Sequence, residues 1–313
     1  MVTRLLNIKY PIIQGGMGNI SDPILVAAVS EAGGLGTIGC GTLSAIQVNE
    51  KIVETRKRTT KPIALNIPLA VNEYREELIE LAINERIPVV SLSAGNPQPF
   101  ISRLKQHGIT VICVVATVKQ GRKAEEAGAD LLVAEGFEAA GINAMQEMTT
   151  LTLIPQLVSH VHIPVVAAGG IGDGKGLAAV LMLGASGVQM GTRFIATQDA
   201  PYSQRYKEKL LNATDQSTLV LGRAHGQVRR VLKGVYTEHI HKHERGYSPD
   251  EYQTLTSEDA HQKGAIDGND EEGFMNGGQV AGLINDLPTV KDLLDTMITE
   301  AKTVMQENMS LLD

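Results

Sequence analysis

The chain has 313 residues, of which 43% are hydrophobic and 20% are charged, and its formal net charge is −7. These proportions are those of a soluble globular protein, and the acidic balance argues against a nucleic-acid or anionic-membrane surface. No apolar stretch reaches the roughly 18 residues that a membrane span needs, and only two cysteines are present, so we expect a reduced, cytoplasmic protein.

Short apolar runs alternate with helical patterns from the start of the chain to Phe194. The first run ends in Gly15-Gly16, and Asp22-Pro23 then opens a helix in the expected cap-then-proline order. Eight such units predict a (β/α)8 barrel, with a doubly wound open sheet as the alternative. The predicted strands are Pro11–Gln14, Leu35–Gly39, Pro62–Pro68, Pro88–Ser93, Ile109–Ala116, Asp130–Ala134, Ile163–Ala168 and Val188–Met190.

The rhythm changes after Phe194. A helix is predicted over Tyr202–Ala213, and residues 214–276 are polar, charged and weakly periodic. We interpret this stretch as a lid or small appended domain, the alternative being a solvated excursion. An apolar helix over Gln279–Leu283 and an amphipathic one over Val290–Met305 follow. We therefore predict a barrel formed by residues 1–213 and 277–313, with residues 214–276 as the addition.

Two predicted strands end in glycine near the middle of the chain. Ile163–Ala168 is followed by Gly169-Gly170, and Val188–Met190 by Gly191-Thr192. Glycine after a buried parallel strand lets backbone amides approach a ligand, and two neighbouring ends would direct N–H groups at one anion. We predict a phosphate site at the C-terminal face of strands seven and eight; the alternative is two tight turns without a ligand.

The other predicted strand ends are rich in glycine and amides and poor in nucleophiles and bases. They hold no Ser/His/Asp set and no cluster with metal-ligand spacing, so we predict no metal. A cofactor with its own reactivity suits such a site, and a flat heterocycle with a phosphate tail fits it. Asn66 and Gln189 would then bond the ring edges, or act only as capping or ladder side chains. His239, His241 and His243 form an HxHxH pattern, a weak metal hypothesis in a segment expected to be extended.

Six segments belong together: QGGM at Gln14–Met17, LNIPL at Leu65–Leu69, AGNP at Ala94–Pro97, AEGFEA at Ala134–Ala139, AAGGIGDG at Ala167–Gly174 and VQMGTRF at Val188–Phe194. With them the chain resembles the nitronate monooxygenase (2-nitropropane dioxygenase) family, which includes the FMN-dependent enoyl-acyl-carrier-protein reductase II. The resemblance runs from about residue 4 to Leu283, and the segment 206–215 is similar to the reductase side of the family.

The resemblance implies FMN as cofactor and NADH or NADPH as co-substrate, with hydride passing through FMN to an enoyl thioester or a quinone. It implies a small-molecule or acyl-thioester substrate and neither nucleic acid nor membrane as a partner, and it leaves a homodimer open. It also implies that Gly15, Gly16, Met17 and Asn66 line the flavin, that Gly169, Gly170, Gly191 and Thr192 bind its phosphate, that Gln189 lies near the ring, and that Glu135 lies at the site floor.

The chain departs from the family at its AGGH motif. Here Gly141 is followed by Ile142 and Asn143, whereas the family histidine is linked to proton abstraction from nitroalkanes. Isoleucine cannot take a proton. Glu147 and Asn143 are our candidate catalytic residues, Glu147 as a replacement base if its loop folds inward; a solvated carboxylate is the alternative. Oxidation of preformed nitronates, which needs no base, and an inactive flavin-binding barrel also stay open.

Overall fold

Eight parallel strands form the centre of the computed structural model, which describes residues 2–309. Their order is β1-β9-β8-β6-β5-β4-β3-β2, and a parallel bridge between Ile13 and Leu35 joins the two ends into a barrel. The predicted (β/α)8 fold is therefore confirmed. The strands are β1 (Ile12–Gln14), β2 (Gly36–Gly39), β3 (Ile63–Pro68), β4 (Val89–Ser93), β5 (Thr110–Val115), β6 (Leu131–Glu135), β8 (Val165–Ala168) and β9 (Val188–Met190).

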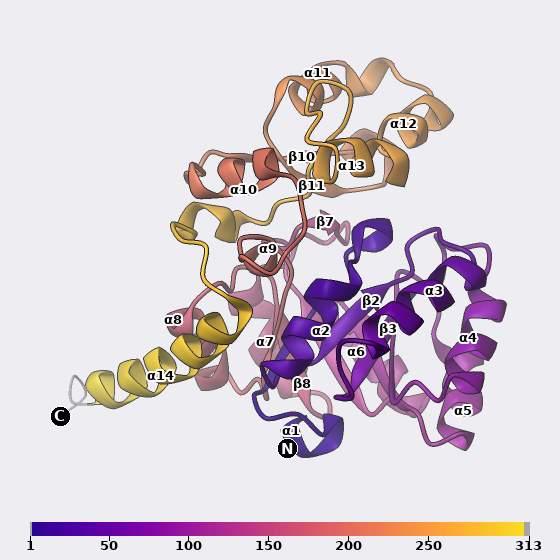
Figure 1. Ribbon diagram of the computed structural model, residues 1–313, viewed down its shortest axis with the longest axis vertical. Helices are drawn as coiled ribbons and strands as arrows, with labels where there is room; N and C mark the ends of the chain where they lie inside the picture. The colour runs from indigo at the N-terminus through magenta and orange to yellow at the C-terminus, as the bar shows by residue number, and fades with distance from the viewer. Residues whose placement is uncertain (1, 310–313) are drawn as a thin grey trace.

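The barrel interior is filled by alternate strand residues, among them Ile13, Val89 and Val133. A short helix that the sequence did not predict, α1 (Val2–Leu6), adds Val2 and Leu6 to this cluster. Figure 1 shows α1 at one end of the barrel, opposite the segment that follows β9. Ligands must therefore enter from the other end.

Helices surround the barrel in alternation with the strands. Two of them begin as expected, because the Asp22 side chain accepts the Ile24 N–H and Ser44 forms a capping box with Gln47. Within residues 2–309, no helix is long and apolar enough to cross a membrane. The surrounding helices are α2 (Pro23–Glu31), α3 (Ala45–Arg56), α4 (Arg75–Asn84), α5 (Gln98–Gln106), α6 (Val118–Glu126), α7 (Thr150–Val158), α8 (Gly174–Met182) and α14 (Val290–Met309).

Residues 214–276, which we call the insert, form two strands of a second sheet and an apolar cluster of their own at the end of the barrel opposite α1 (Figure 1). The cluster includes Tyr252 and Phe274. The elements after β9 are α9 (Thr192–Ile195), α10 (Gln204–Leu211), β10 (Thr218–Leu221), the 3-10 turn η2 (Arg223–His225), β11 (Arg229–Leu232), α11 (Val235–His243), η3 (Glu244–Gly246), α12 (Pro249–Leu255), α13 (Glu258–Ala265) and η4 (Gln279–Leu283).

Two expectations for the segments outside the barrel core were wrong, and a third was confirmed. The HxHxH residues lie on helix α11 rather than in an extended segment, and the described residues contain no group that could hold a metal ion. The helix predicted over Gln279–Leu283 is present as a 3-10 helix. The stretch 137–148, expected to be a loop, contains strand β7 (Gly141–Ile142), which pairs antiparallel with β11.

Two of the contacts between the insert and the barrel lie on opposite sides of the barrel mouth. In the β7–β11 pair, Ile142 lies opposite Arg229. On the other side of the barrel mouth, α13 packs on the 3-10 turn η1 (Gly18–Ile20), where Glu258 accepts the N–H of Asn19 at 2.8 Å. The insert is therefore attached at two points across the mouth.

Helix α14 closes the outer layer by packing on α8, and Gly174 is the closest point of that contact. A Cβ at Gly174 would lie 2.5 Å from Glu300 Cβ and 2.6 Å from the Met297 carbonyl oxygen. We predict that Gly174→Ala lowers the free energy of unfolding by about 1–3 kcal/mol, because α14 must shift. Gly176→Ala in the same helix is the control, since its Cβ would stay at least 3.3 Å from its neighbours. Urea denaturation that showed equal losses for both variants would contradict this packing.

Candidate active site

A cavity of about 1000 Å³ lies at the carboxyl ends of the barrel strands, beneath the insert. Barrel loops form one side of this cavity, and residues of the insert form the other. Eleven of the twelve predicted site residues line it, and Glu147 does not. Those eleven are Gly15, Gly16, Met17, Asn66, Glu135, Asn143, Gly169, Gly170, Gln189, Gly191 and Thr192. The structure thus brings together residues that lie up to 177 positions apart in the sequence, as Gly15 and Thr192 do.

The ends of β8 and β9 present unpaired backbone donors to this cavity. Gly169 and Gly170 have φ of +99° and +76°, a conformation that favours glycine. The N–H groups of Gly170, Gly191 and Thr192 have no acceptor within residues 2–309. A Cβ at Gly191 would meet nothing within 4 Å, so that backbone faces open space. Such a group of N–H donors is suited to an anion.

The glycine turn after β8 is held by a side chain that the sequence analysis did not single out. Both carboxylate oxygens of Glu138 accept the N–H of Thr150 at 3.0 Å. The Thr150 hydroxyl has two acceptors within reach, Glu138 Oε2 at 3.0 Å and the Gly169 carbonyl at 2.9 Å. These bonds fix Gly169 from behind. The position of the N–H donors is therefore set by Thr150 and Glu138.

A second support reaches Thr192 from the far end of the chain. Its buried hydroxyl oxygen accepts the N–H of Gly278 at 3.0 Å, and the next N–H, of Gln279, donates to the Glu138 carbonyl at 2.9 Å. Gly278 lines the cavity itself. The GGQ turn before η4 is therefore part of the site, which sequence reasoning missed because it assigned the segment only to a helix.

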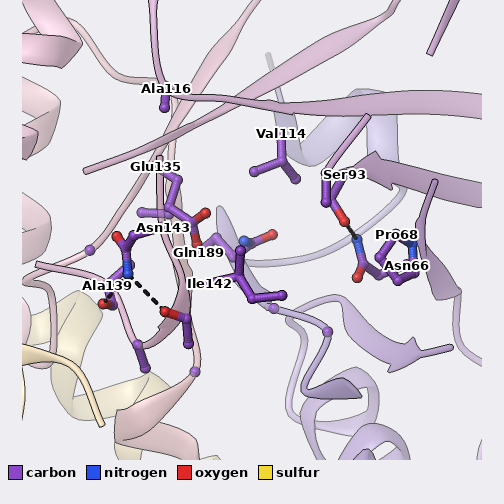
Figure 2. A pocket seen from close by; sticks show the side chains of 18 of the residues that line it. Asn66, Pro68, Ser93, Val114, Ala116, Glu135, Ala139, Ile142, Asn143 and Gln189 are labelled. Carbon is purple, nitrogen blue, oxygen red and sulfur yellow. Dashed lines mark hydrogen bonds between the residues drawn. The ribbon is translucent and has the colours of Figure 1, made fainter. Parts of the chain in front are cut away.

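The two predicted amide side chains lie in the cavity with different degrees of constraint. Asn66 Nδ2 lies 3.1 Å from Ser93 Oγ and 3.3 Å from Ser91 Oγ, which fixes its carboxamide (Figure 2). A Cβ at Gly16 would lie 2.6 Å from Asn66 Cβ, so only glycine allows the two loops to approach. Gln189 lines the cavity beside Gly15, whose added Cβ would be 3.2 Å from Gln189 Nε2.

Glu135 ends β6 at the inner side of the cavity (Figure 2). Burial raises the pKa of its carboxyl group from 4.5 to about 7. A carboxyl group with such a pKa exchanges a proton near neutral pH. Glu135 is therefore a titratable group as well as part of the cavity floor.

Ile142 and Asn143 occupy the loop where the family motif is altered. Ile142 projects into the cavity that Asn66 and Gln189 also line (Figure 2). Asn143 Nδ2 donates to the Ala139 carbonyl at 3.0 Å. Asn143 Nδ2 also lies 3.0 Å from the Gly141 carbonyl, so the amide holds the loop. Asn143 therefore binds the backbone of the loop on which Ile142 lies.

Glu147 lies outside the cavity, and its loop does not fold inward. Its carboxylate binds Arg223 in the insert, with Oε1 2.6 Å from Nε and Oε2 3.2 Å from a terminal nitrogen. The hydrogen bond from Arg223 lowers the pKa of Glu147. A carboxylate that is neutralised at the surface is a poor base, so the geometry favours the alternative of a loop carboxylate without a catalytic role.

The insert adds polar residues to the cavity roof that sequence reasoning missed. Arg229 and His261 are 8% and 2% exposed, and Glu258 and Asn276 lie with them on the cavity lining. Their signal in the sequence was weak, because each stands alone in a polar stretch with no spacing that marks a site. His225, by contrast, stacks on Tyr252 at 4.4 Å between ring centroids and does not line the cavity.

The fold and the site define a barrel protein with a group of unpaired N–H donors at the ends of the last two strands and a roofed cavity. Comparison with known proteins identifies the family. The nitronate monooxygenase family model matches residues 1–300, and the chain belongs to that family. It is 37% identical to a probable nitronate monooxygenase of Staphylococcus saprophyticus, over 77% of this chain and 79% of that protein.

Two further proteins are similar over nearly their whole length. The chain is 32% identical to the (3aS,4S,5R,7aS)-5-hydroxy-7a-methyl-1-oxo-octahydro-1H-indene-4-carboxyl-CoA dehydrogenase of Rhodococcus jostii, covering 96% of this chain and 95% of the other. The solved structure of FabK from Thermotoga maritima matches with a TM-score of 0.95 and 39% identity, covering 99% of this chain and 98% of that one. Enoyl reductases and nitronate monooxygenases thus both stand among its relatives.

The raised pKa of Glu135 predicts a specific pH dependence of stability. Its folded-state pKa of about 7 lies above the ordinary 4.5, so between these pH values the carboxyl group takes up a proton when the protein folds. The free energy of unfolding therefore falls as pH rises from about 4.5 to about 7. Glu135→Gln removes this loss. In urea denaturation of the cofactor-free protein, the variant should be more stable than wild type by about 2–3 kcal/mol at pH 8 and equal to it near pH 4. Exposed Glu77→Gln is the control; a constant difference between Glu135→Gln and wild type at both pH values would refute the shift.

Proposed function

We propose that the protein is an FMN-dependent oxidoreductase that takes hydride from NADH or NADPH and passes it to an electron-poor acceptor, with an enoyl thioester as the first candidate and a quinone as the second. The observation that carries the proposal is the group of unpaired N–H donors of Gly170, Gly191 and Thr192 at the edge of a large cavity. Bound FMN would supply the hydride chemistry.

The residues present fit a flavin with a phosphate tail. The open face at Gly191 and the donors beside it suit the phosphate, and Gly15, Gly16 and Met17 give a backbone-lined wall. The carboxamides of Asn66 and Gln189 supply donors and acceptors for ring edges. Glu138 and Thr150 keep the phosphate donors in place.

An acyl thioester is favoured as the acceptor by two kinds of relative. FabK from Thermotoga maritima covers nearly the whole chain at 39% identity, and the Rhodococcus jostii relative carries a CoA thioester in its name. Ile142 also weakens nitroalkane oxidation by proton abstraction, since it cannot act as a base. Hydride transfer through the flavin does not need that base.

Oxidation of preformed nitronates is the second candidate function. Its support is the match to the nitronate monooxygenase model and to the Staphylococcus saprophyticus relative. A nitronate is already an anion, so the isoleucine at position 142 does not oppose it.

An anaerobic reduction series separates the candidates. The proposal expects a yellow purified protein that NADH or NADPH bleaches and that a 2-enoyl thioester then re-oxidises. Bleaching by propyl-2-nitronate, without a response to pyridine nucleotides, would instead establish the second function. A yellow protein that responds to neither would be an inactive flavin-binding barrel.

Filling the open space at Gly191 tests the phosphate site directly. We predict that Gly191→Val weakens FMN binding by about 100-fold or more, because the side chain enters the cavity beside the N–H donors. Gly246→Val is the matched control, since a Cβ there also meets nothing within 4 Å but lies outside the cavity. Quenching of flavin fluorescence gives both dissociation constants; equal constants would place the phosphate elsewhere.

Removing the charge of Glu147 tests whether it is a base. Because its carboxylate binds Arg223 outside the cavity, Glu147→Gln should change the turnover rate by less than about twofold. A loss of about 100-fold with an altered pH profile would restore Glu147 as a catalytic group.

A further inference from the structure

A buried network of ionisable groups lies on the insert side of the cavity and has no part in binding the flavin as proposed. His261 of α13 is 2% exposed, and its ring stacks on Phe274 with 5.2 Å between centroids. Its Nδ1 is buried without a hydrogen-bond partner and lies 3.8 Å from Glu258 Oε2. Its Nε2 lies 3.1 Å from Asn276 Nδ2. A buried ring nitrogen without a hydrogen-bond partner is uncommon in a folded protein, so this one requires an explanation.

The neighbours of His261 include charges of both signs. Burial alone would raise the pKa of Glu258, but His261, the charge of Arg229 and the Asn19 N–H outweigh it and lower the pKa to about 2. A fixed negative charge therefore faces Nδ1, while the positive charge of Arg229 stands behind it. These two are the charged groups that face the ring from α13 and β11; Asn19, Phe274 and Asn276 complete its surroundings without charge.

Asn276 sets which nitrogen of the neutral ring carries hydrogen. Because Asn276 Nδ2 donates to Nε2, the proton of the neutral ring is on Nδ1, toward Glu258. Asn276 Oδ1 is also buried without a partner. Asn276 therefore sets the tautomer of the neutral ring, and a protonated Nε2 cannot keep this bond because both atoms would then be donors.

Most other titratable groups of the cavity lining are engaged with neighbours or lie at its exposed edge. Glu138 is occupied by Thr150, and Glu258 stays ionised. The Tyr206 hydroxyl donates to the Asn276 carbonyl, and burial raises the pKa of the Cys113 thiol to about 12. Lys123 and Glu126 lie on exposed positions of α6. Glu135, on the barrel side, and His261, on the insert side, remain.

We propose that His261 gives a proton to the substrate in this cavity, so that the insert supplies an acid–base group as well as the roof; this rests on the proposed function above. In the reduction of a 2-enoyl thioester, the β-carbon receives hydride from the reduced flavin. The electron pair of the broken C=C π bond then joins the α-carbon to the proton from Nε2. The flavin is oxidised, the acyl chain is reduced, and the neutral ring regains its proton from water. His261 also lies close to the altered motif. An added Cβ on Gly141 would be 3.7 Å from Asn276 Nδ2, the atom that contacts the His261 ring.

The test separates the two half-reactions under anaerobic conditions, with crotonyl-CoA as the acceptor. In His261→Gln, bleaching by NADH or NADPH should stay within about twofold of wild type, while re-oxidation slows by about 100-fold or more at saturating acceptor. Added imidazole should restore part of the re-oxidation rate in His261→Gly. His225→Gln is the matched control, because His225 also stacks on an aromatic ring of the insert but lies outside the cavity.

A readout without cofactor accompanies the kinetics. Nitrogen NMR of the cofactor-free protein, with the His261 signal assigned by its loss in His261→Gln, should show that the neutral form of the ring carries its proton on Nδ1. A neutral form with its proton on Nε2 would overturn the inference, as would normal re-oxidation of the His261→Gln flavin or a loss that imidazole does not restore. Wild-type flavin that crotonyl-CoA cannot re-oxidise would instead overturn the proposed function itself.

Discussion

Backbone N–H groups without partners at the ends of two adjacent strands are the constraint on which the site depends. An N–H donor without an acceptor is energetically costly when it is buried. Three such donors among residues 2–309, at one edge of a cavity, indicate a place for a ligand that accepts hydrogen bonds. Gly169 and Gly170 allow the turn that exposes them, and Glu138 and Thr150 hold it. The rest of the cavity is arranged around this edge.

The insert completes that cavity because it is attached to the barrel on both sides of the mouth. Pairing of β11 with β7 fixes it beside Ile142, and the contact of Glu258 with Asn19 fixes it across the opening. Arg229 and His261 reach the cavity as a consequence. The same segment thus covers the cavity and brings ionisable groups into its lining.

Local patterns were enough to predict the barrel strands and the glycines that follow them, because buried strands and strand-end turns have short-range signatures. They were not enough for β7, whose two residues form a strand only through pairing with β11. Nor could they predict Glu258 and His261, because Glu258 contacts Asn19 across a separation of 239 positions in the sequence. For Glu147, the sequence left a choice between base and surface carboxylate, and the Arg223 ion pair favours the second.

The central claim, that the strand-end amides bind the phosphate of FMN, is tested most directly by a crystal structure of the protein with FMN. The account predicts electron density for the phosphate within hydrogen-bonding distance of the N–H groups of Gly170, Gly191 and Thr192, with the ring toward Asn66 and Gln189. A phosphate bound elsewhere in the cavity, or crystals grown with FMN that contain no flavin, would contradict it.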